Sequence, residues 1–451
     1  MQRKSTPGLS AQIKELLIQR GLEARARAAT QTLAAAAATA ESDPADFERY
    51  CRFERHPGYQ QLRIITAGAA QLGIASPFFK PHEGIAGART RIGGREYLNF
   101  SSYNYLGLNG HPAVSAAAKA AIDRYGTSVS ASRAVSGERP VHRDLEKALA
   151  RIYGTDDAVV FVSGHATNVT TIGYLFGPRD LVLHDELIHN STLQGIQLAG
   201  AHRLPFPHND WAALDDLLTR QRREFERVLI VLEGIYSMDG DYPELPRFIE
   251  VKRRHRALLM VDEAHSFGVM GPNGLGIREH FALSGDAVDI WMGTLSKTLA
   301  GCGGYIAGTS ALVEHLKFLA PGFLYSVGMA PPVAAAALAA LECLKQHPER
   351  PQALRERGAL FLELARAAGI DTGTSAGISV IPAIVGSSIR AVRVSDALFT
   401  RGINVQPILY PAVPEKQARL RFFMCCEHSE SDIRTAVAAL AAEMVNQRGI
   451  A

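Results

Sequence analysis

Short apolar runs alternate with helical patterns from about residue 95 onward. Several of these runs are apolar without polar alternation, as expected for strands that are covered on both faces. The strand candidates are Ala158–Val162, Asp180–Leu183, Val228–Leu232, Leu258–Val261, Asp289–Met292 and Tyr305–Ala307. Helical periodicity lies between them, for example at Arg143–Ile152 and Leu245–Arg256. This alternation predicts an α/β fold with a mostly parallel, doubly wound sheet.

The regions on either side of this alternation have different patterns. Residues 1 to about 60 show helical spacing that is broken by Glu41-Ser-Asp-Pro44. After Pro331-Pro332, an Ala-rich helix is predicted at Val333–Leu344, then a helix at about 352–368 and a mixed α/β tail. We therefore expect a helical extension and lead-in over residues 1–95, a large domain over 96–335 and a small C-terminal domain over 336–451.

Composition excludes several classes of function. The net charge is only +3, and the short basic clusters at 220–223 and 252–256 are typical of solvated helix faces, so no nucleic-acid surface is predicted. No apolar run reaches the roughly 18 residues of a membrane helix. The five cysteines include an adjacent pair but no Cys-x-x-Cys spacing, so we expect a reducing, cytoplasmic setting and no metal site.

The stretch Val261-Asp-Glu-Ala-His-Ser266 contains the Asp-Glu-Ala-His box of many ATP-driven helicases. An ATPase of that kind also needs a Gly-x-x-x-x-Gly-Lys-Ser/Thr loop to cradle phosphates. The chain contains no Gly-Lys dipeptide. The box must therefore serve another purpose.

Lys297 indicates what that other purpose is. It lies between small hydroxyl residues after a predicted strand, and a glycine-rich segment follows it. A lysine in such a place can form a Schiff base with an aldehyde cofactor, and Asp262, at the end of a neighbouring strand, can pair with a protonated pyridine nitrogen. Each residue alone has an ordinary explanation, as a solvated lysine or a turn aspartate. Together they predict pyridoxal phosphate as the cofactor.

With these motifs the chain resembles the α-oxoamine synthases, which are fold-type I enzymes that use pyridoxal phosphate. The family includes serine palmitoyltransferase and 8-amino-7-oxononanoate synthase. The resemblance covers about residues 95–445. Its motifs are Phe100-Ser-Ser-Tyr-Asn-Tyr-Leu-Gly-Leu108, His189-Asn-Ser191, His208-Asn-Asp210, Glu233-Gly-Ile-Tyr-Ser-Met-Asp-Gly-Asp241, Val261-Asp-Glu-Ala-His-Ser266 and Thr294-Leu-Ser-Lys297.

The resemblance implies roles for individual residues around the cofactor ring. Lys297 would hold the cofactor covalently and later move the α-proton of the substrate. Asp262 would pair with the pyridine nitrogen, and His265 would hydrogen-bond the ring oxygen. His189 would stack on the ring, although a histidine in this position is also an ordinary helix-start residue.

Further residues are candidates for the cofactor phosphate. A helix that starts after a strand presents free N–H groups and a positive dipole end to an anion. The candidate phosphate and ring contacts are Gly164, His165, Ser237, Thr294, Ser296 and Ser326. Ser326 belongs to a segment that resembles one reaching the phosphate of the partner subunit. Relatives often have Thr where this chain has Val327.

The resemblance also implies the substrate contacts. Arg421 matches the arginine that binds the carboxylate of the amino acid, a task that suits the two-pronged guanidinium. Asn104 and Tyr103 lie in a segment that approaches the same carboxylate.

The implied reaction is a decarboxylative, Claisen-type condensation of a small amino acid with an acyl thioester. It yields an α-amino ketone, carbon dioxide and a free thiol. Coenzyme A and acyl carrier protein are both open as acyl carriers, because the phrases at 126–133 and 163–173 resemble synthases embedded in polyketide assembly lines. A homodimer is expected. The alternatives are an aminotransferase of the same fold and a non-catalytic partner subunit.

Overall fold

The computed structural model describes residues 50–71, 73 and 76–447. The chain divides into two compact units, residues 1–75 and 76–451. In the first unit, the described residues form the turn η1 (Phe53–Arg55) and the helix α3 (Pro57–Gln71). The helical pattern predicted for residues 1–49 lies outside the described residues.

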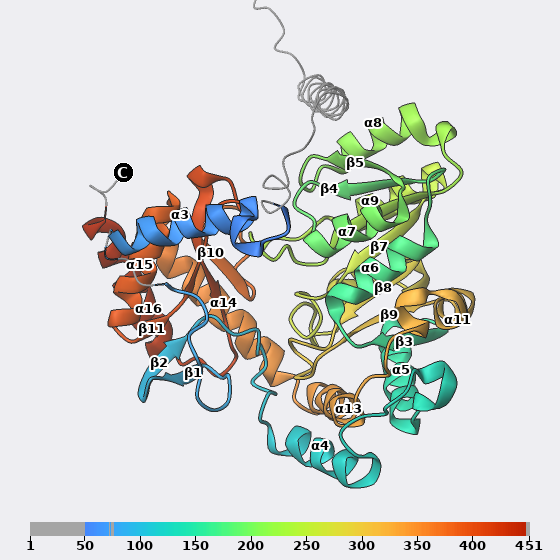
Figure 1. The fold of residues 1–451 in the computed structure, drawn as a ribbon, viewed down its shortest axis with the longest axis horizontal. Coiled ribbons are helices and arrows are strands. Elements are labelled where there is room, and N and C mark those ends of the chain that lie inside the picture. The colour runs from blue at the N-terminus through green and yellow to red at the C-terminus, as the bar shows by residue number, and fades with distance from the viewer. Residues whose placement is uncertain (1–49, 72, 74–75, 448–451) are drawn as a thin grey trace, which may run out of the picture. The chain divides into compact units, whose positions relative to one another are not determined.

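The second unit is built on a seven-stranded sheet with the order β3-β9-β8-β7-β6-β4-β5 (Figure 1). Its strands are β3 (Asp157–Phe161), β4 (Leu181–Asp185), β5 (His202–Phe206), β6 (Val228–Glu233), β7 (Leu258–Asp262), β8 (Ile290–Thr294) and β9 (Gly304–Gly308). Only β9 runs antiparallel to its neighbours in this sheet. The predicted α/β class and mostly parallel sheet are confirmed.

Both faces of this sheet are buried. Alternate residues of one strand belong to two separate hydrophobic cores. In β6, for example, Leu229 packs into the core on one face and Ile230 into the core on the other. This two-sided burial explains why the strands are apolar without alternation. The helices on one face are α6 (Gly164–Leu175), α7 (Asn190–Ala199) and α11 (Ser310–Leu319), and those on the other are α5 (Pro140–Tyr153), α8 (Trp211–Gln221), α9 (Leu245–His255) and α13 (Pro331–Gln346).

The edge strand β5 was not predicted. Four of its five residues, from His202 to Pro205, are exposed or half-buried, so the strand has no continuous apolar run. Pro205 lacks an N–H group and is tolerated because the strand has only one neighbour.

The C-terminal region forms two smaller sheets. One contains β10 (Val380–Gly386), β13 (Ala418–Phe423) and β12 (Gln406–Ile408). The other joins β1 (Arg89–Ile92) and β2 (Arg95–Asn99) to β11 (Ile403–Asn404). The helices of this region are α14 (Glu349–Ala367), α15 (Ser388–Thr400) and α16 (Glu430–Asn446), while α4 (Pro112–Tyr125) packs on α13. The predicted boundaries at 95 and 335 stay a prediction.

Short helical pieces complete the described chain. They are α10 (Ile277–His280), α12 (Pro321–Leu324) and the turns at 133–137, 222–224, 285–287 and 415–417. Among the described residues, no helix has the length and apolar character needed to cross a membrane.

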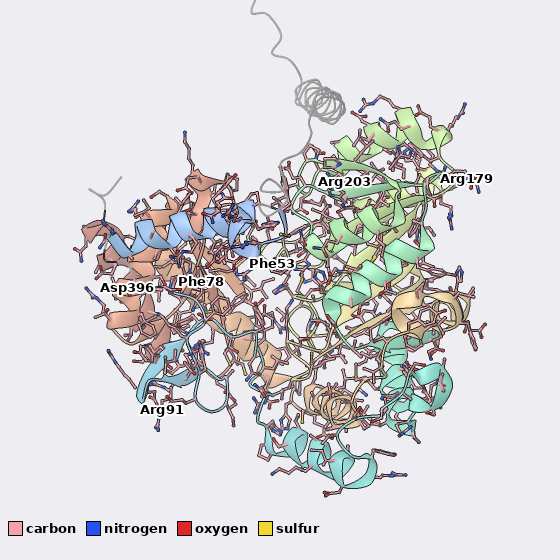
Figure 2. All side chains as sticks on the ribbon, in the orientation of Figure 1. Phe53, Phe78, Arg91, Arg179, Arg203 and Asp396 are labelled. Atoms are coloured by element: carbon pink, nitrogen blue, oxygen red, sulfur yellow. The ribbon has the colours of Figure 1, made fainter. Side chains whose placement is uncertain are left out.

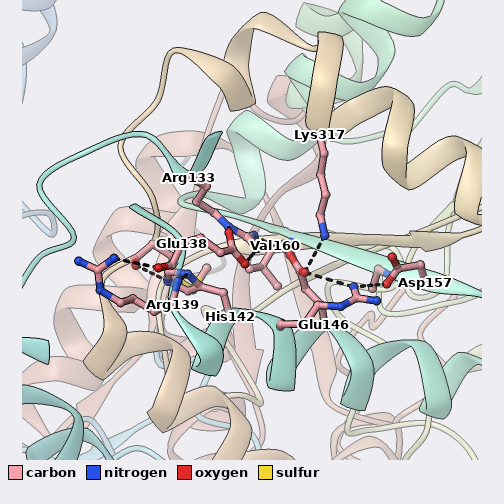
Figure 3. Close-up of polar contacts among 11 residues, drawn as sticks. Arg133, Glu138, Arg139, His142, Glu146, Asp157, Val160 and Lys317 are labelled. Atoms are coloured by element: carbon pink, nitrogen blue, oxygen red, sulfur yellow. Dashed lines mark hydrogen bonds and ion pairs between the residues drawn. The ribbon is translucent and has the colours of Figure 1, made fainter. Parts of the chain in front are cut away.

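A buried ionic network ties several elements together (Figure 3). The Arg133 guanidinium donates to the carboxylate of Glu138 at 2.6 Å and to that of Glu146 at 2.5 Å. Glu146 is fully buried and also accepts from the Lys317 ammonium at 2.8 Å and the Val160 N–H at 3.1 Å. The network therefore links the turn at 133–137 to α5, α11 and β3.

Removing one member of this network should cost much more than breaking a surface ion pair. We expect Arg133→Met to lower the free energy of unfolding by about 3 kcal/mol, because it removes one of the cations paired with the fully buried Glu146 and leaves Lys317 as the nearest one. The control is Arg179→Met, which breaks an exposed pair with Glu226 (Figure 2) and should cost less than about 1 kcal/mol. Urea unfolding of both variants measures the difference, and equal losses would contradict the structural role of the network.

Candidate active site

Polar side chains end three neighbouring parallel strands at one edge of the large sheet. Glu233 ends β6, Asp262 ends β7 and Thr294 ends β8, and Lys297 follows β8 directly. The helices α6 and α7 begin at the same edge. A cavity of about 90 Å³ lies there. Of the residues predicted from the sequence, it brings together Gly164, His165, His189, Asp262, His265, Thr294 and Lys297.

Asp262 is buried, and both of its carboxylate oxygens accept hydrogen bonds. One carboxylate oxygen accepts from the Asn168 side-chain amide at 2.9 Å, and the other accepts from the Ala264 N–H at 2.9 Å. Two N–H donors stabilise a carboxylate ion that has little access to water. Asn168 also donates to Ser191 at 2.9 Å, so it fixes both α6 and the start of α7 against Asp262.

Lys297 lies in the same cavity. Burial, only partly offset by Asp262, lowers the pKa of its amine to about 8. A larger share of Lys297 is therefore neutral near pH 8 than of a solvated lysine, and only the neutral amine is a nucleophile. The ring of Tyr103 faces it, with 5.7 Å between the ammonium nitrogen and the ring centroid.

His265 is held by a tyrosine that no sequence motif assigned to it. Its Nδ1 lies 2.6 Å from the Tyr105 hydroxyl, which is fully buried. Burial, with the charges of Lys297 and Arg421, lowers the pKa of His265 well below its usual value. The ring is therefore neutral, and the contact with Tyr105 leaves Nε2 for another partner.

Arg421 approaches this group of residues from β13 of the C-terminal region. Its guanidinium stacks over Phe423, 4.6 Å from the ring centroid, and Phe423 in turn lies parallel to the ring of His265. Burial lowers the pKa of Arg421. Its charge also acts on Lys297 and His189.

Comparison with known proteins shows which enzymes the chain is similar to. Residues 95–440 match the class I and II aminotransferases. An 8-amino-7-oxononanoate synthase of Geobacter sulfurreducens is 44% identical over 362 residues, which are 79% of this chain and 91% of that one. The enzyme of that name from Symbiobacterium thermophilum is 39% identical over 374 residues, 83% of this chain and 95% of that one.

Solved structures agree with the sequence relatives. A serine palmitoyltransferase of Sphingomonas wittichii superposes with a TM-score of 0.84 at 28% identity, covering 89% of this chain and 100% of that chain. A serine palmitoyltransferase of S. paucimobilis, solved with a bound compound of pyridoxal phosphate and myriocin, gives a TM-score of 0.83 at 29% identity over 87% of this chain and 99% of that chain.

The chain belongs to the α-oxoamine synthase family. The predicted family, the fold-type I architecture and the pyridoxal phosphate cofactor are thereby confirmed. The predicted likeness to polyketide-embedded synthases finds no support, because the relatives named above are 8-amino-7-oxononanoate synthases and serine palmitoyltransferases.

The residues present fit the cofactor of this family. A Cβ atom at Gly164 would lie 2.8 Å from the Thr294 hydroxyl oxygen, so glycine keeps open the space at the start of α6. That helix start offers N–H groups to a phosphate. His189 lines the cavity while its Nδ1 accepts from the Ser191 N–H and caps α7. The two explanations offered for His189 are thus compatible, and its stacking on the ring stays a prediction.

Three predicted phosphate contacts do not line the cavity of this synthase. The hydroxyl of Ser296 lies 3.4 Å from the Gly303 carbonyl oxygen, and the Ser237 N–H donates to Glu233. Ser326 lines a different, smaller cavity of its own chain. Its predicted contact concerns the partner subunit and stays a prediction.

The two predicted substrate-binding residues of this segment, Tyr103 and Asn104, point in different directions. Tyr103 faces Lys297, as described above. Asn104 instead points into its own loop, where its amide nitrogen donates to the Ala86 carbonyl oxygen at 2.8 Å and its oxygen accepts from the Asn109 N–H at 3.1 Å. Both ends of the Asn104 amide are thus engaged within the loop, and its contact with the substrate carboxylate stays a prediction.

A larger cavity of about 440 Å³ lies at the opposite ends of β7 and β8. It contains none of the predicted site residues. Its Arg227 is paired with Asp180, and its Asp289 is paired with Lys252 at 2.6 Å. These charged side chains are therefore already satisfied within the synthase.

The His208-Asn-Asp210 motif joins the large sheet to the C-terminal region. His208 Nδ1 lies 2.9 Å from Asp185 at the end of β4, and Nε2 lies 2.9 Å from Asp241. Asp241 also accepts from the Thr374 hydroxyl at 2.5 Å. These two carboxylates raise the pKa of His208 to about 10 despite its burial. The imidazole is therefore a cation that donates from both nitrogens.

This arrangement predicts a pH-dependent contribution to stability. Because the folded-state pKa of about 10 exceeds the ordinary value of 6.5, the contribution is full below pH 6.5 and is lost as pH rises through 10. We expect His208→Gln to lower the free energy of unfolding by about 2 kcal/mol at pH 7 and by much less at pH 10.5.

Urea unfolding of the apoprotein across this pH range measures the effect. His202→Gln, at an exposed position of the edge strand, controls for the loss of an imidazole. A loss of stability in His208→Gln that is the same at both pH values would show that the ring is not protonated in the fold.

Proposed function

We propose that this synthase condenses a small amino acid with an acyl thioester and releases carbon dioxide, a free thiol and an α-amino ketone. The family membership and the shared cavity of Lys297, Asp262 and His265 support the reaction type. The observation that carries the substrate assignment is Arg421, a half-buried arginine that has no acidic partner in the described part of the chain.

Arg421 differs in this respect from its neighbour on the same strand. Arg419 is paired with the Asp239 carboxylate at 2.5 Å. Among the described residues Arg421 forms no ion pair, and its Nη1 donates only to the Ser237 carbonyl oxygen at 3.0 Å and the Met238 sulfur at 3.3 Å. Its Nε is buried and has no hydrogen-bond partner among the residues that the structure describes. A half-buried guanidinium in this state is ready for an external carboxylate, which it can bind through two N–H groups.

The remaining residues divide the chemistry. Pyridoxal phosphate, when bound, accepts the electron pair released at the α-carbon of the amino acid. Lys297 would hold the cofactor covalently and then carry the α-proton on its Nζ. Asp262 would keep the pyridine nitrogen protonated, His265 would donate to the ring oxygen, and His189 would cover one face of the ring.

The acyl carrier and the assembly are finer parts of the proposal. The acyl group arrives on coenzyme A or on an acyl carrier protein. Titrating the enzyme with each thioester while following the release of carbon dioxide distinguishes the two carriers.

We propose a homodimer in which Ser326 contacts the phosphate of the cofactor in the partner subunit. In the single chain the flanking Tyr325 is 86% exposed and Val327 is 50% exposed. This exposure of large apolar side chains supports a partner subunit that covers the segment. Sedimentation equilibrium tests the dimer.

An aminotransferase reaction is the alternative that shares this cofactor site. The names of the relatives do not favour it. Exchange of amino groups with a keto acid, in the absence of any thioester, would support it. The non-catalytic alternative requires the loss of the cofactor lysine, whereas Lys297 is present in the cavity.

Lys297→Ala should abolish both the covalent attachment of the cofactor and turnover. We expect condensation to fall by at least about 10³-fold, since the amine is also the group that moves the α-proton. Visible absorbance of the purified protein and release of carbon dioxide measure the two losses. Lys345→Ala, in an exposed helix pair with Glu342, is the control. Undiminished turnover in Lys297→Ala would refute the proposed mechanism.

Arg421→Met should weaken binding of the amino acid and leave cofactor uptake intact. Loss of a charge-assisted hydrogen-bonded pair costs about 2 kcal/mol, so KM for the amino acid should rise by about 30-fold. The comparison is Arg419→Met, which breaks an internal ion pair and should mainly lower the melting temperature. If both variants raised KM equally, the carboxylate would not be bound by Arg421 in particular.

A further inference from the structure

Glu233 is a buried acid in the active-site cavity to which neither the motifs nor the proposed mechanism give a role. It is the last residue of β6 and is paired in register with Asp262, the last residue of β7. It is 3% exposed and lines the cavity that contains Lys297. Two carboxyl groups therefore lie side by side on neighbouring strands, next to a single amine.

The hydrogen bonds of the two carboxyl groups differ. Both oxygens of Asp262 accept from N–H donors, as described above. In Glu233 only one oxygen, Oε2, accepts a hydrogen bond, from the Ser237 N–H at a long 3.3 Å. The other oxygen, Oε1, is fully buried and has no partner among the described residues. No cation pairs with Glu233 in the described part of the chain.

The charges around Glu233 also favour its neutral form. Asp262 on β7 and Asp185 on β4 are negative neighbours, and together with burial they raise the pKa of Glu233 well above its usual value. Lys297 and the Ser237 N–H act in the opposite direction but do not outweigh burial. Arg421, from β13, also faces this acid. Neighbouring carboxyl groups whose surroundings differ in this way commonly divide into one anion and one acid.

We propose that Glu233 is held as a neutral acid and donates a hydrogen bond from Oε1 to an acceptor atom of the bound cofactor. Asp262 is then the anion of the cavity and Glu233 its acid. The assignment gives a partner to the one oxygen of this pair that the protein leaves unpaired. It rests on the proposed function, because the acceptor belongs to pyridoxal phosphate.

The first test is spectroscopic and compares two variants of the holoprotein. Glu233→Gln keeps a neutral side chain with an N–H donor, and Glu233→Leu removes the donor. We expect the pH midpoint of the visible cofactor band to stay near the wild-type value in Glu233→Gln and to shift by about one pH unit in Glu233→Leu, the size expected for one hydrogen bond. A wild-type midpoint in Glu233→Leu, or equal shifts in both variants, would overturn the proposal.

Glu263 provides a matched control, because it is a buried carboxyl group next to Asp262 that does not line the cavity. It accepts from the Ser266 hydroxyl and from the Ile277 N–H at 3.0 Å. Glu263→Gln should leave the midpoint of the cofactor band unchanged. A shift as large as that of Glu233→Leu would mean that the band responds to any buried charge nearby.

The second test uses the apoprotein and does not depend on the cofactor. A carboxyl group whose pKa is raised in the folded state makes its full contribution to stability below its unfolded-state pKa of 4.5. This contribution is lost as the pH rises above that value. The melting temperature of Glu233→Gln relative to wild type should therefore increase from pH 6 to pH 9. A difference that is constant or decreases with pH would show that Glu233 is ionised in the fold.

The two tests distinguish the possible failures. If wild-type protein takes up no pyridoxal phosphate, the proposed function fails, while the melting experiment still decides the charge state of Glu233. If wild type binds the cofactor but Glu233→Leu has its unchanged spectrum, only the present proposal fails.

Discussion

The active site depends on holding the carboxyl group of Asp262 in a place with little water. The protein meets this requirement with two N–H donors, one from the Asn168 side chain and one from the backbone of Ala264. The other titratable groups of the cavity are then arranged around that one carboxyl group. It partly offsets the effect of burial on Lys297 and disfavours a second anion at Glu233. Burial and this one carboxyl group thus together shift the pKa values of its neighbours.

The parallel sheet makes this arrangement possible. Because β6, β7 and β8 run in the same direction, their last residues fall on one edge, and each strand contributes one polar group to the cavity. Arg421, which we propose binds the carboxylate of the amino acid, comes from a different sheet. The loop at 234–241 joins the two regions, since Asp241 contacts His208 on one side and the Ser237 carbonyl oxygen accepts from Arg421 on the other. Gly240 is required there, because a Cβ atom would lie 1.9 Å from the Val380 carbonyl oxygen.

Sequence alone predicted the parts of this site that are local in the chain. The predicted strands of the large sheet lie within two residues of their observed positions, and Lys297, Asp262 and His265 lie where their motifs suggested. Long-range partners were missed. Asn168 is separated from Asp262 by 94 positions and Tyr105 from His265 by 160, so no spacing rule connects them.

Asn104 shows the converse case. Its motif is correct, but the neighbouring loop captures its amide. Whether a polar side chain serves its own loop or the site depends on which donors fold against it, and the order of residues does not reveal that.

The double contact of Asn168 has a mechanical consequence. This side chain belongs to α6, whose first turn forms the proposed phosphate site, and it touches both Asp262 and the Ser191 hydroxyl. A small displacement of α6 would therefore alter the hydrogen bonding of Asp262. If α6 holds the cofactor phosphate and Asp262 pairs with the pyridine nitrogen, as proposed, a substitution that moves this helix would change both contacts at once.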